Sequence, residues 1–286
     1  MNADGPPGRA VTAARTALVT GAGRGIGAAV ARRLAAQGMR IVALDRCSDD
    51  PGVEYPMATR EELDAVVADC GNGSRAVVAD VGDRAGLASV LGELLGERED
   101  NRGGIDTVVC AAGVVWGGGP VWSTPPEVWE ALVRTNTSGV LNTAAAVVPR
   151  MLPAPGTGRS PGDVPRSRGR FVVVASAAAD RGLPMMGAYA ATKAAAVSIV
   201  RSMAADLGPS GITVNAVSPG STDTRILAAS ADVYGLGSPQ EFAVHHTTQR
   251  LVGADEVASA VAWLCSDEAS AVTGAVLAVD GGMTAT

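Results

Sequence analysis

The chain has 286 residues, a hydrophobic fraction of 47% and a formal charge of −6 at pH 7. This length permits one large α/β domain or two small ones, and the charge disfavours nucleic acid and anionic membranes as partners. The four cysteines show no paired spacing and there is no secretory or long apolar segment, so a reduced, cytoplasmic setting is expected. The two histidines are neighbours, His245 and His246, whose side chains diverge, so no metal site is expected.

Apolar, β-branched runs alternate with helical patterns along the chain, which predicts an α/β fold with a doubly wound parallel sheet. Residues 1–14 are rich in Gly and Pro, and a disordered arm is expected there. Residues 15–286 are expected to form a single domain, because the motifs described below are spread over the whole of it.

The first strand, Thr16–Thr20, leads into a Gly-rich loop at 21–27 and then into an Ala-rich helical pattern. Such a strand, turn and helix N-terminus present backbone N–H groups and a helix dipole to a pyrophosphate. The next strand, 40–44, ends at Asp45. An acid at that point suits the hydroxyls of an adenosine ribose, and the alternative is an ordinary turn residue.

A long connection, 46–58, follows Asp45, whereas a direct strand-to-helix connection needs only about 2–6 residues. We expect this insertion to fold over the adenine side of a cofactor. A helix is predicted at 59–69, with Thr59 and Glu62 forming a capping box. The later elements are predicted as strands at 74–79 and 105–110, a long helix at 126–151, a second insertion at 153–168 that forms a surface loop, and strands at 170–175, 212–217 and 275–279.

Tyr189 and Lys193 are four residues apart on a predicted helix and therefore share one face. An ammonium beside a phenol favours the phenolate, so Lys193 is expected to lower the pKa of Tyr189 toward the working pH. Ser176 comes at the end of a predicted strand and is expected to hold a substrate oxygen beside the tyrosine. Taken alone, a Tyr-x-x-x-Lys pair also fits an exposed helix pair.

These motifs together resemble the short-chain dehydrogenase/reductase family, from about Thr16 to Met283. Thr20, Gly21, Gly25 and Gly27 match the cofactor loop of that family. Residues 110–113 read Cys-Ala-Ala-Gly where the family usually has Asn-Asn-Ala-Gly, so a side-chain hydrogen bond that helps to pin the central strands is lost. The resemblance implies a Rossmann fold, a nicotinamide cofactor and a substrate lid at 221–250.

The resemblance also assigns the site residues. The implied catalytic residues are Asn136, Ser176, Tyr189 and Lys193. Tyr189 would exchange a proton with the substrate oxygen, Ser176 would orient that oxygen, and Lys193 would also hold the nicotinamide ribose. The carbonyl of Asn136 would hold a water that relays protons near Lys193. The implied cofactor-binding residues are Thr20, Gly21, Gly23, Arg24, Gly25, Ile26, Gly27, Asp45, Arg46, Asp80, Val81, Ala111, Ala112, Gly113, Tyr189, Lys193, Pro219, Gly220, Thr222 and Thr224.

NAD is the predicted cofactor, because the charge of Asp45 would repel the 2′-phosphate of NADP. Arg24 and Arg46 complicate that prediction, since either could reach toward a phosphate. The predicted reaction interconverts a secondary alcohol and a ketone. Trp116 and Trp122 are candidates to line the substrate pocket, and the alternative is that they are exposed loop tryptophans. By resemblance to the family a homotetramer is expected, with the 126–151 helix and the last strand in interfaces.

A narrower resemblance lies in the insertion, where 55–63 read Tyr-Pro-Met-Ala-Thr-Arg-Glu-Glu-Leu. This segment is similar to one in mycofactocin-associated, carveol dehydrogenase-like members of the family. The resemblance implies a tightly held NAD that is re-oxidised in place by an external redox carrier. The alternatives are a ketoreductase of secondary metabolism with freely exchanging NAD(P)H and, from another class, a non-catalytic nucleotide-sensing regulator.

Overall fold

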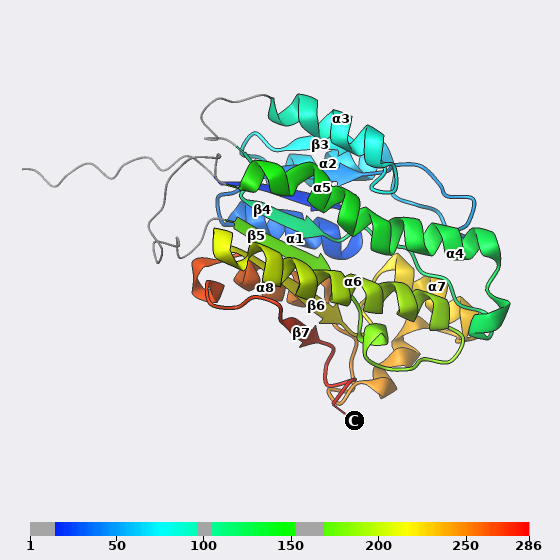
Figure 1. The fold of residues 1–286 in the computed structure, drawn as a ribbon. Coiled ribbons are helices and arrows are strands. Elements are labelled where there is room, and N and C mark those ends of the chain that lie inside the picture. The colour runs from blue at the N-terminus through cyan, green and yellow to red at the C-terminus, as the bar shows by residue number, and fades with distance from the viewer. Residues whose placement is uncertain (1–14, 97–103, 153–168, 286) are drawn as a thin grey trace, which may run out of the picture.

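A computed structural model describes residues 15–96, 104–152 and 169–285 (Figure 1). Its centre is a seven-stranded parallel sheet in the order β3-β2-β1-β4-β5-β6-β7. The strands are β1 (Thr16–Thr20), β2 (Arg40–Asp45), β3 (Arg75–Val78), β4 (Thr107–Cys110), β5 (Gly169–Val174), β6 (Ile212–Pro219) and β7 (Val276–Val279). The predicted fold is confirmed. The arm expected at 1–14 and the loop expected at 153–168 lie outside the described residues.

Helices cover both faces of the sheet. They are α1 (Gly25–Ala36), α2 (Arg60–Cys70), α3 (Arg84–Leu95), α4 (Pro126–Leu132), α5 (Gly139–Met151), α6 (Gly187–Leu207), α7 (Arg225–Val233) and α8 (Ala254–Leu264). In Figure 1, α3, α5 and α6 lie in front of the sheet, and α1 and α8 lie behind it. Strand β1 shows why both layers are needed: Leu18 packs in one apolar cluster and its neighbour Val19 in the other, and both are 0% exposed.

The strand order reverses at the centre of the sheet. Strand β1 pairs with β2 on one side and with β4 on the other. The connection after β1 and the connection after β4 therefore run in opposite directions along the sheet. In an open parallel sheet, this reversal leaves a crevice beyond the carboxyl ends of the strands, where ligands bind. The loop after β1 and the loop after β4 therefore form the two sides of one site.

The predicted capping box is confirmed at the start of α2. Thr59 Oγ1 accepts the Glu62 N–H (3.2 Å), and Glu62 Oε2 accepts the Thr59 N–H (3.0 Å). Each bond satisfies a backbone N–H at the helix N-terminus that has no partner within the helix. This cap fixes the point at which the long connection after β2 ends.

The helix predicted at 126–151 is corrected, because a π turn at Val133–Ser138 separates α4 from α5. Asn136 lies within this turn and is 1% exposed. Its Oδ1 accepts the Val114 N–H (2.8 Å), and its Nδ2 donates to the Val114 carbonyl (2.9 Å). The wider turn places a polar side chain against the loop after β4, which the regular helical pattern of the sequence does not reveal.

Candidate active site

A cavity of about 870 Å³ lies at the carboxyl ends of the central strands. One end is lined by the Gly-rich loop, Asp45 and Asp80, and the other by Ser176, Tyr189 and the segment predicted as the lid. This volume is in the range of cofactor and ligand sites. The structure brings all the predicted site residues to the cavity wall except Thr20, Gly23 and Asn136.

Gly21 and Gly27 of the Gly-rich loop are packed too closely against neighbouring backbone to carry a side chain. A Cβ at Gly27 would lie 2.0 Å from the Gly21 carbonyl oxygen, and one at Gly21, where φ is +66°, would lie 2.6 Å from Ala112 Cα. Helix α1 begins at Gly25, so its free N–H groups face the cavity wall. The buried Nη1 of Arg24 has no hydrogen-bond partner among the described residues. A helix N-terminus beside an unpartnered cationic donor fits a phosphate-bearing cofactor.

Thr20 and Gly23 lie behind this loop rather than at the cavity wall, and their contact with a cofactor remains a prediction. Thr20 Oγ1 accepts the Ala112 N–H (3.3 Å) and so joins the loops after β1 and β4. Gly23 donates its N–H to Asp45 Oδ2 (2.9 Å). The motif defines their spacing, but it does not say which backbone groups turn toward the cavity.

Asp45 lies at the end of β2 and is 8% exposed. Its Oδ2 is bound to Gly23, and its Oδ1 lies 3.4 Å from the Cys47 nitrogen. The carboxylate is therefore held at the cavity wall by backbone groups on both sides. The proposed contact with the ribose hydroxyls remains a prediction.

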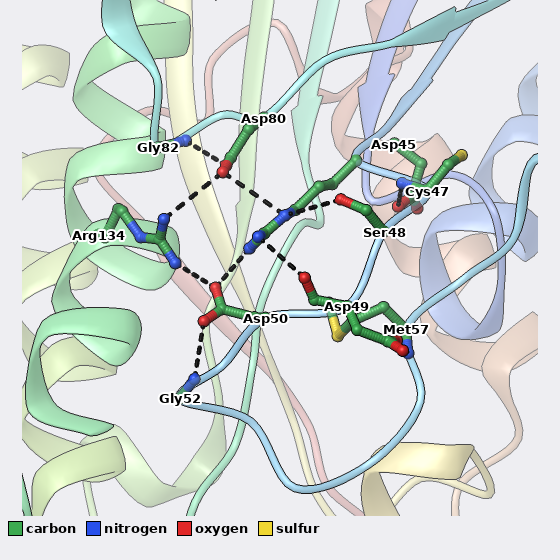
Figure 2. Close-up of polar contacts among 11 residues, drawn as sticks. Asp45, Cys47, Ser48, Asp49, Asp50, Gly52, Met57, Asp80, Gly82 and Arg134 are labelled. Carbon is green, nitrogen blue, oxygen red and sulfur yellow. Dashed lines mark hydrogen bonds and ion pairs between the residues drawn. The ribbon is translucent and has the colours of Figure 1, made fainter. Parts of the chain in front are cut away.

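The insertion 46–58, here named the strap, is organised around a buried acid (Figure 2). Asp50 is 4% exposed, and its Oδ2 accepts hydrogen bonds from Arg46 and from Arg134 of the π turn. Its Oδ1 accepts the Gly52 N–H (3.0 Å). Asp80, at the cavity wall, lies 3.7 Å from Arg46 Nε and 3.8 Å from Arg134 Nη1. The strap is thus tied to the opposite side of the crevice.

The far end of the strap is fixed by Tyr55. Its hydroxyl accepts the Val115 N–H (3.0 Å), and its ring centroid lies 5.9 Å from the Arg24 guanidinium carbon. Burial raises the pKa of Tyr55 to about 12, so the phenol stays protonated at neutral pH. Nearby, Val53 and Met57 pack against the apolar cluster around α4. The strap therefore spans the crevice from the end of β2 to the loop after β4.

Lys193 and Tyr189 meet at the other end of the cavity, as the sequence predicts. Lys193 is 5% exposed, its Nζ donates to the Val174 carbonyl (3.0 Å), and it lies 5.9 Å from the centroid of the Tyr189 ring. Burial lowers the pKa of Lys193 to about 8. A Cβ at Gly113 would lie 3.1 Å from Lys193 Nζ, so the glycine leaves room for the ammonium.

The expected lowering of the tyrosine pKa is corrected. Burial raises the pKa of Tyr189, and the Ser176 side chain opposes that rise. Desolvation of the phenolate is therefore the dominant effect, and the charged form of Lys193 is itself disfavoured by burial. At neutral pH the phenol keeps its proton, which suits donation to a substrate oxygen.

Thr192 is a residue of this site that the sequence analysis missed. Its Oγ1 donates to the Tyr189 carbonyl (2.8 Å) and accepts from Asn136 Nδ2 (3.0 Å). With the Val114 bonds, this contact engages both atoms of the Asn136 amide, so Asn136 lies behind the cavity wall. The available signal was a hydroxyl residue directly before Lys193, which links the active-site helix to the π turn.

The substrate end of the cavity is largely apolar. Leu227 and Phe242 form a small cluster there, and the ring of Tyr234 packs edge-on against Phe242 with centroids 5.7 Å apart. The predicted roles of Trp116 and Trp122 are wrong: Trp116 packs against the cluster around α4, and Trp122 is 85% exposed.

The lid segment contacts the helix after the strap, because Arg225, at the start of α7, pairs with Glu62 of α2 (2.8 Å).

Within 15–96, 104–152 and 169–285, no helix is both long and apolar enough to span a membrane. The same residues contain no group of three or more His, Cys, Asp or Glu side chains placed to bind a metal ion.

Comparison with known proteins agrees with this geometry. The model of a family described as enoyl-(acyl carrier protein) reductase matches residues 21–284. The chain is 36% identical to an uncharacterized NAD-dependent oxidoreductase of Mycobacterium tuberculosis over 94% of this chain and 95% of that protein. It is 32% identical to the 3-oxoacyl-[acyl-carrier-protein] reductase FabG of Escherichia coli, over 94% of this chain and 97% of the relative.

The chain belongs to the short-chain dehydrogenase/reductase family. It is therefore an NAD(P)-dependent oxidoreductase, as the motifs predict. Among solved structures of this family, carveol dehydrogenase from Mycobacterium avium in complex with NAD superposes with a TM-score of 0.83, at 30% identity and over 96% of this chain and 99% of that one. The prediction of NAD as the cofactor is confirmed by what such relatives bind.

Proposed function

We propose that this short-chain dehydrogenase/reductase interconverts an apolar secondary alcohol and its ketone with NAD. The observation that carries the proposal is the single cavity that joins the Gly-rich loop and Asp45 to Ser176, Tyr189 and Lys193. When bound, the nicotinamide would supply or accept the hydride. The apolar residues around Phe242 at the other end support an apolar substrate.

The residues of the chain would divide the remaining chemistry. Tyr189 would donate its proton to the substrate oxygen in reduction and recover it in oxidation. Ser176 would orient that oxygen, since its hydroxyl lies at the cavity wall beside Tyr189. Lys193, held by the Val174 carbonyl, would bind the nicotinamide ribose, and Asn136 would brace the helix of Tyr189 through Thr192.

We further propose that the strap retains NAD between turnovers, so that an external redox carrier of the mycofactocin type re-oxidises it in place. Support comes from the strap contacts at both ends and from the similarity to carveol dehydrogenase. The alternative is a ketoreductase with exchangeable NAD(P)H, which the similarity to the FabG reductase supports.

A panel of secondary alcohols distinguishes an enzyme with retained NAD from a ketoreductase with an exchangeable cofactor. Purified protein would be assayed both for reduction of added NAD and for reduction of an artificial electron-accepting dye. Dye reduction that does not depend on added NAD is expected for a retained cofactor. Many turnovers with free NAD alone would support the ketoreductase alternative, and no turnover with any alcohol or ketone would contradict the proposed reaction.

A homotetramer is proposed from the family and from exposed apolar side chains. Trp129 of α4 is 44% exposed, Leu141 of α5 46% and Trp263 of α8 41%. Large apolar side chains that are exposed on the surface of a single chain are typical of subunit interfaces. Light scattering during size-exclusion chromatography tests this, and a monomeric mass would contradict it.

A further inference from the structure

Arg46 presents a conflict within the cofactor site. It directly follows Asp45, and both residues line the same cavity. An arginine beside the ribose is the side chain that accommodates the 2′-phosphate of NADP, whereas the acid accepts the free hydroxyls of NAD. Two adjacent residues therefore favour opposite cofactors, and the outcome depends on where the guanidinium of Arg46 points.

Each nitrogen of the Arg46 guanidinium donates one hydrogen bond within the strap. Its Nε donates to Ser48 Oγ (3.1 Å), its Nη2 to the Asp49 carbonyl (3.0 Å) and its Nη1 to Asp50 Oδ2. Each of its three nitrogens thus has a partner in the four residues after it. These bonds use three of the five guanidinium N–H groups and hold its orientation toward the strap, so turning the guanidinium toward a ribose phosphate would require breaking them.

Asp50 is the charged partner in that set, and it is buried. Burial alone would raise the pKa of Asp50, but the Gly52 N–H and the guanidiniums of Arg46 and Arg134 outweigh that effect and hold the pKa below its usual value. The acid is therefore ionised at neutral pH. Arg46 and Arg134 each form ion pairs with both Asp50 and Asp80, so two cations are matched by two carboxylates within this set of pairs.

We propose that Asp50 is a specificity-determining residue of this site: it holds Arg46 in the strap, denies a 2′-phosphate its cation and leaves Asp45 to select NAD. The inference rests on the proposed NAD-dependent function. Arg24 lines the same cavity, and its Nη1 has no partner among the described residues, so it is a second cation that Asp50 does not hold; the proposal concerns Arg46 alone.

The test is the Asp50→Asn variant, with direct binding as the readout. Asparagine keeps an oxygen for the Gly52 N–H but loses the charge that holds Arg46. The Kd values of NADH and NADPH would be measured by the fluorescence of the bound nicotinamide. The preference for NADH over NADPH should fall about tenfold or more, since tenfold is ~1.4 kcal/mol, close to the lower end of what one charge-assisted hydrogen bond contributes.

Asp49→Asn is the matched control. It makes the same charge change one residue away, and its Oδ1 can still accept the Met57 N–H. Its side chain makes no bond to Arg46, so the preference should stay within about twofold of the wild type. An unchanged preference in a folded Asp50→Asn variant, or an equal change in Asp49→Asn, would overturn the inference.

Arg46→Gln keeps the inference testable even if Asp50→Asn does not fold. With Arg46 already held away from the ribose, its removal should affect NADH and NADPH alike through the strap and leave the preference between them within about twofold of the wild type. Tenfold weaker NADPH binding with no matching change for NADH would show that Arg46 already serves the phosphate, and would refute the role of Asp50. If the wild type bound neither nucleotide, the proposed function itself would fail.

Discussion

Tyr55→Phe should loosen the strap and accelerate the release of NAD. The change removes one oxygen atom, and the Val115 N–H that it accepts loses its partner. Leaving such a group without a partner when the strap is closed costs about 1–3 kcal/mol, whereas water can satisfy it when the strap is open. The opening equilibrium should therefore shift by about 5–150-fold.

The off-rate of NADH reports this shift directly if release requires opening of the strap. Protein loaded with NADH would be mixed rapidly with excess NAD, and the loss of bound-nicotinamide fluorescence would be followed. Tyr234→Phe is a matched change, because its hydroxyl bonds the Pro184 carbonyl at the substrate end. An off-rate for Tyr55→Phe within twofold of the wild type, in a protein that still folds, would show that this bond does not hold the strap.

Three further changes address the catalytic end and the lid segment. Tyr189→Phe should lower kcat by about 10²–10⁴-fold with an unchanged Kd for NADH, and near-normal turnover in stopped-flow assays would remove Tyr189 from its role. Lys193→Ala should lower kcat and also raise the Kd of NADH, so slower turnover with unaltered titrations would refute the ribose contact. His246 is 1% exposed and its Nε2 accepts the Ser221 N–H, and burial lowers its pKa below the ordinary value of 6.5. As the pH falls, His246 therefore binds a proton more readily in the unfolded chain than in the folded one. The free energy of unfolding should fall as the pH drops below about 6.5. His246→Gln, measured by urea unfolding across that range, should show a smaller fall, and equal slopes would contradict the argument.

Local patterns in the sequence predicted the architecture and most of the cavity wall. The Gly-rich loop, Asp45 and the Tyr189–Lys193 pair each depend on short spacings, which the fold preserves. The contacts of Asp50 could not be predicted in the same way, because Arg134 is 84 residues away in the chain. The pKa of Tyr189 was misjudged for a related reason: burial depends on the whole fold, and the Tyr-x-x-x-Lys spacing does not reveal it.

The π turn between α4 and α5 also has a consequence for the register of the chain. Each residue added to an α-helix rotates everything beyond it by about 100°. The apolar side of α4 joins the cluster that holds the strap, whereas Val140 and Val147 of α5 join the main core between the sheet and α3. The wider turn between them lets α4 and α5 each face a different cluster. A single-residue deletion within Val133–Ser138 would therefore not be structurally neutral. It would rotate the apolar face of α4 or of α5 away from the cluster in which that face packs.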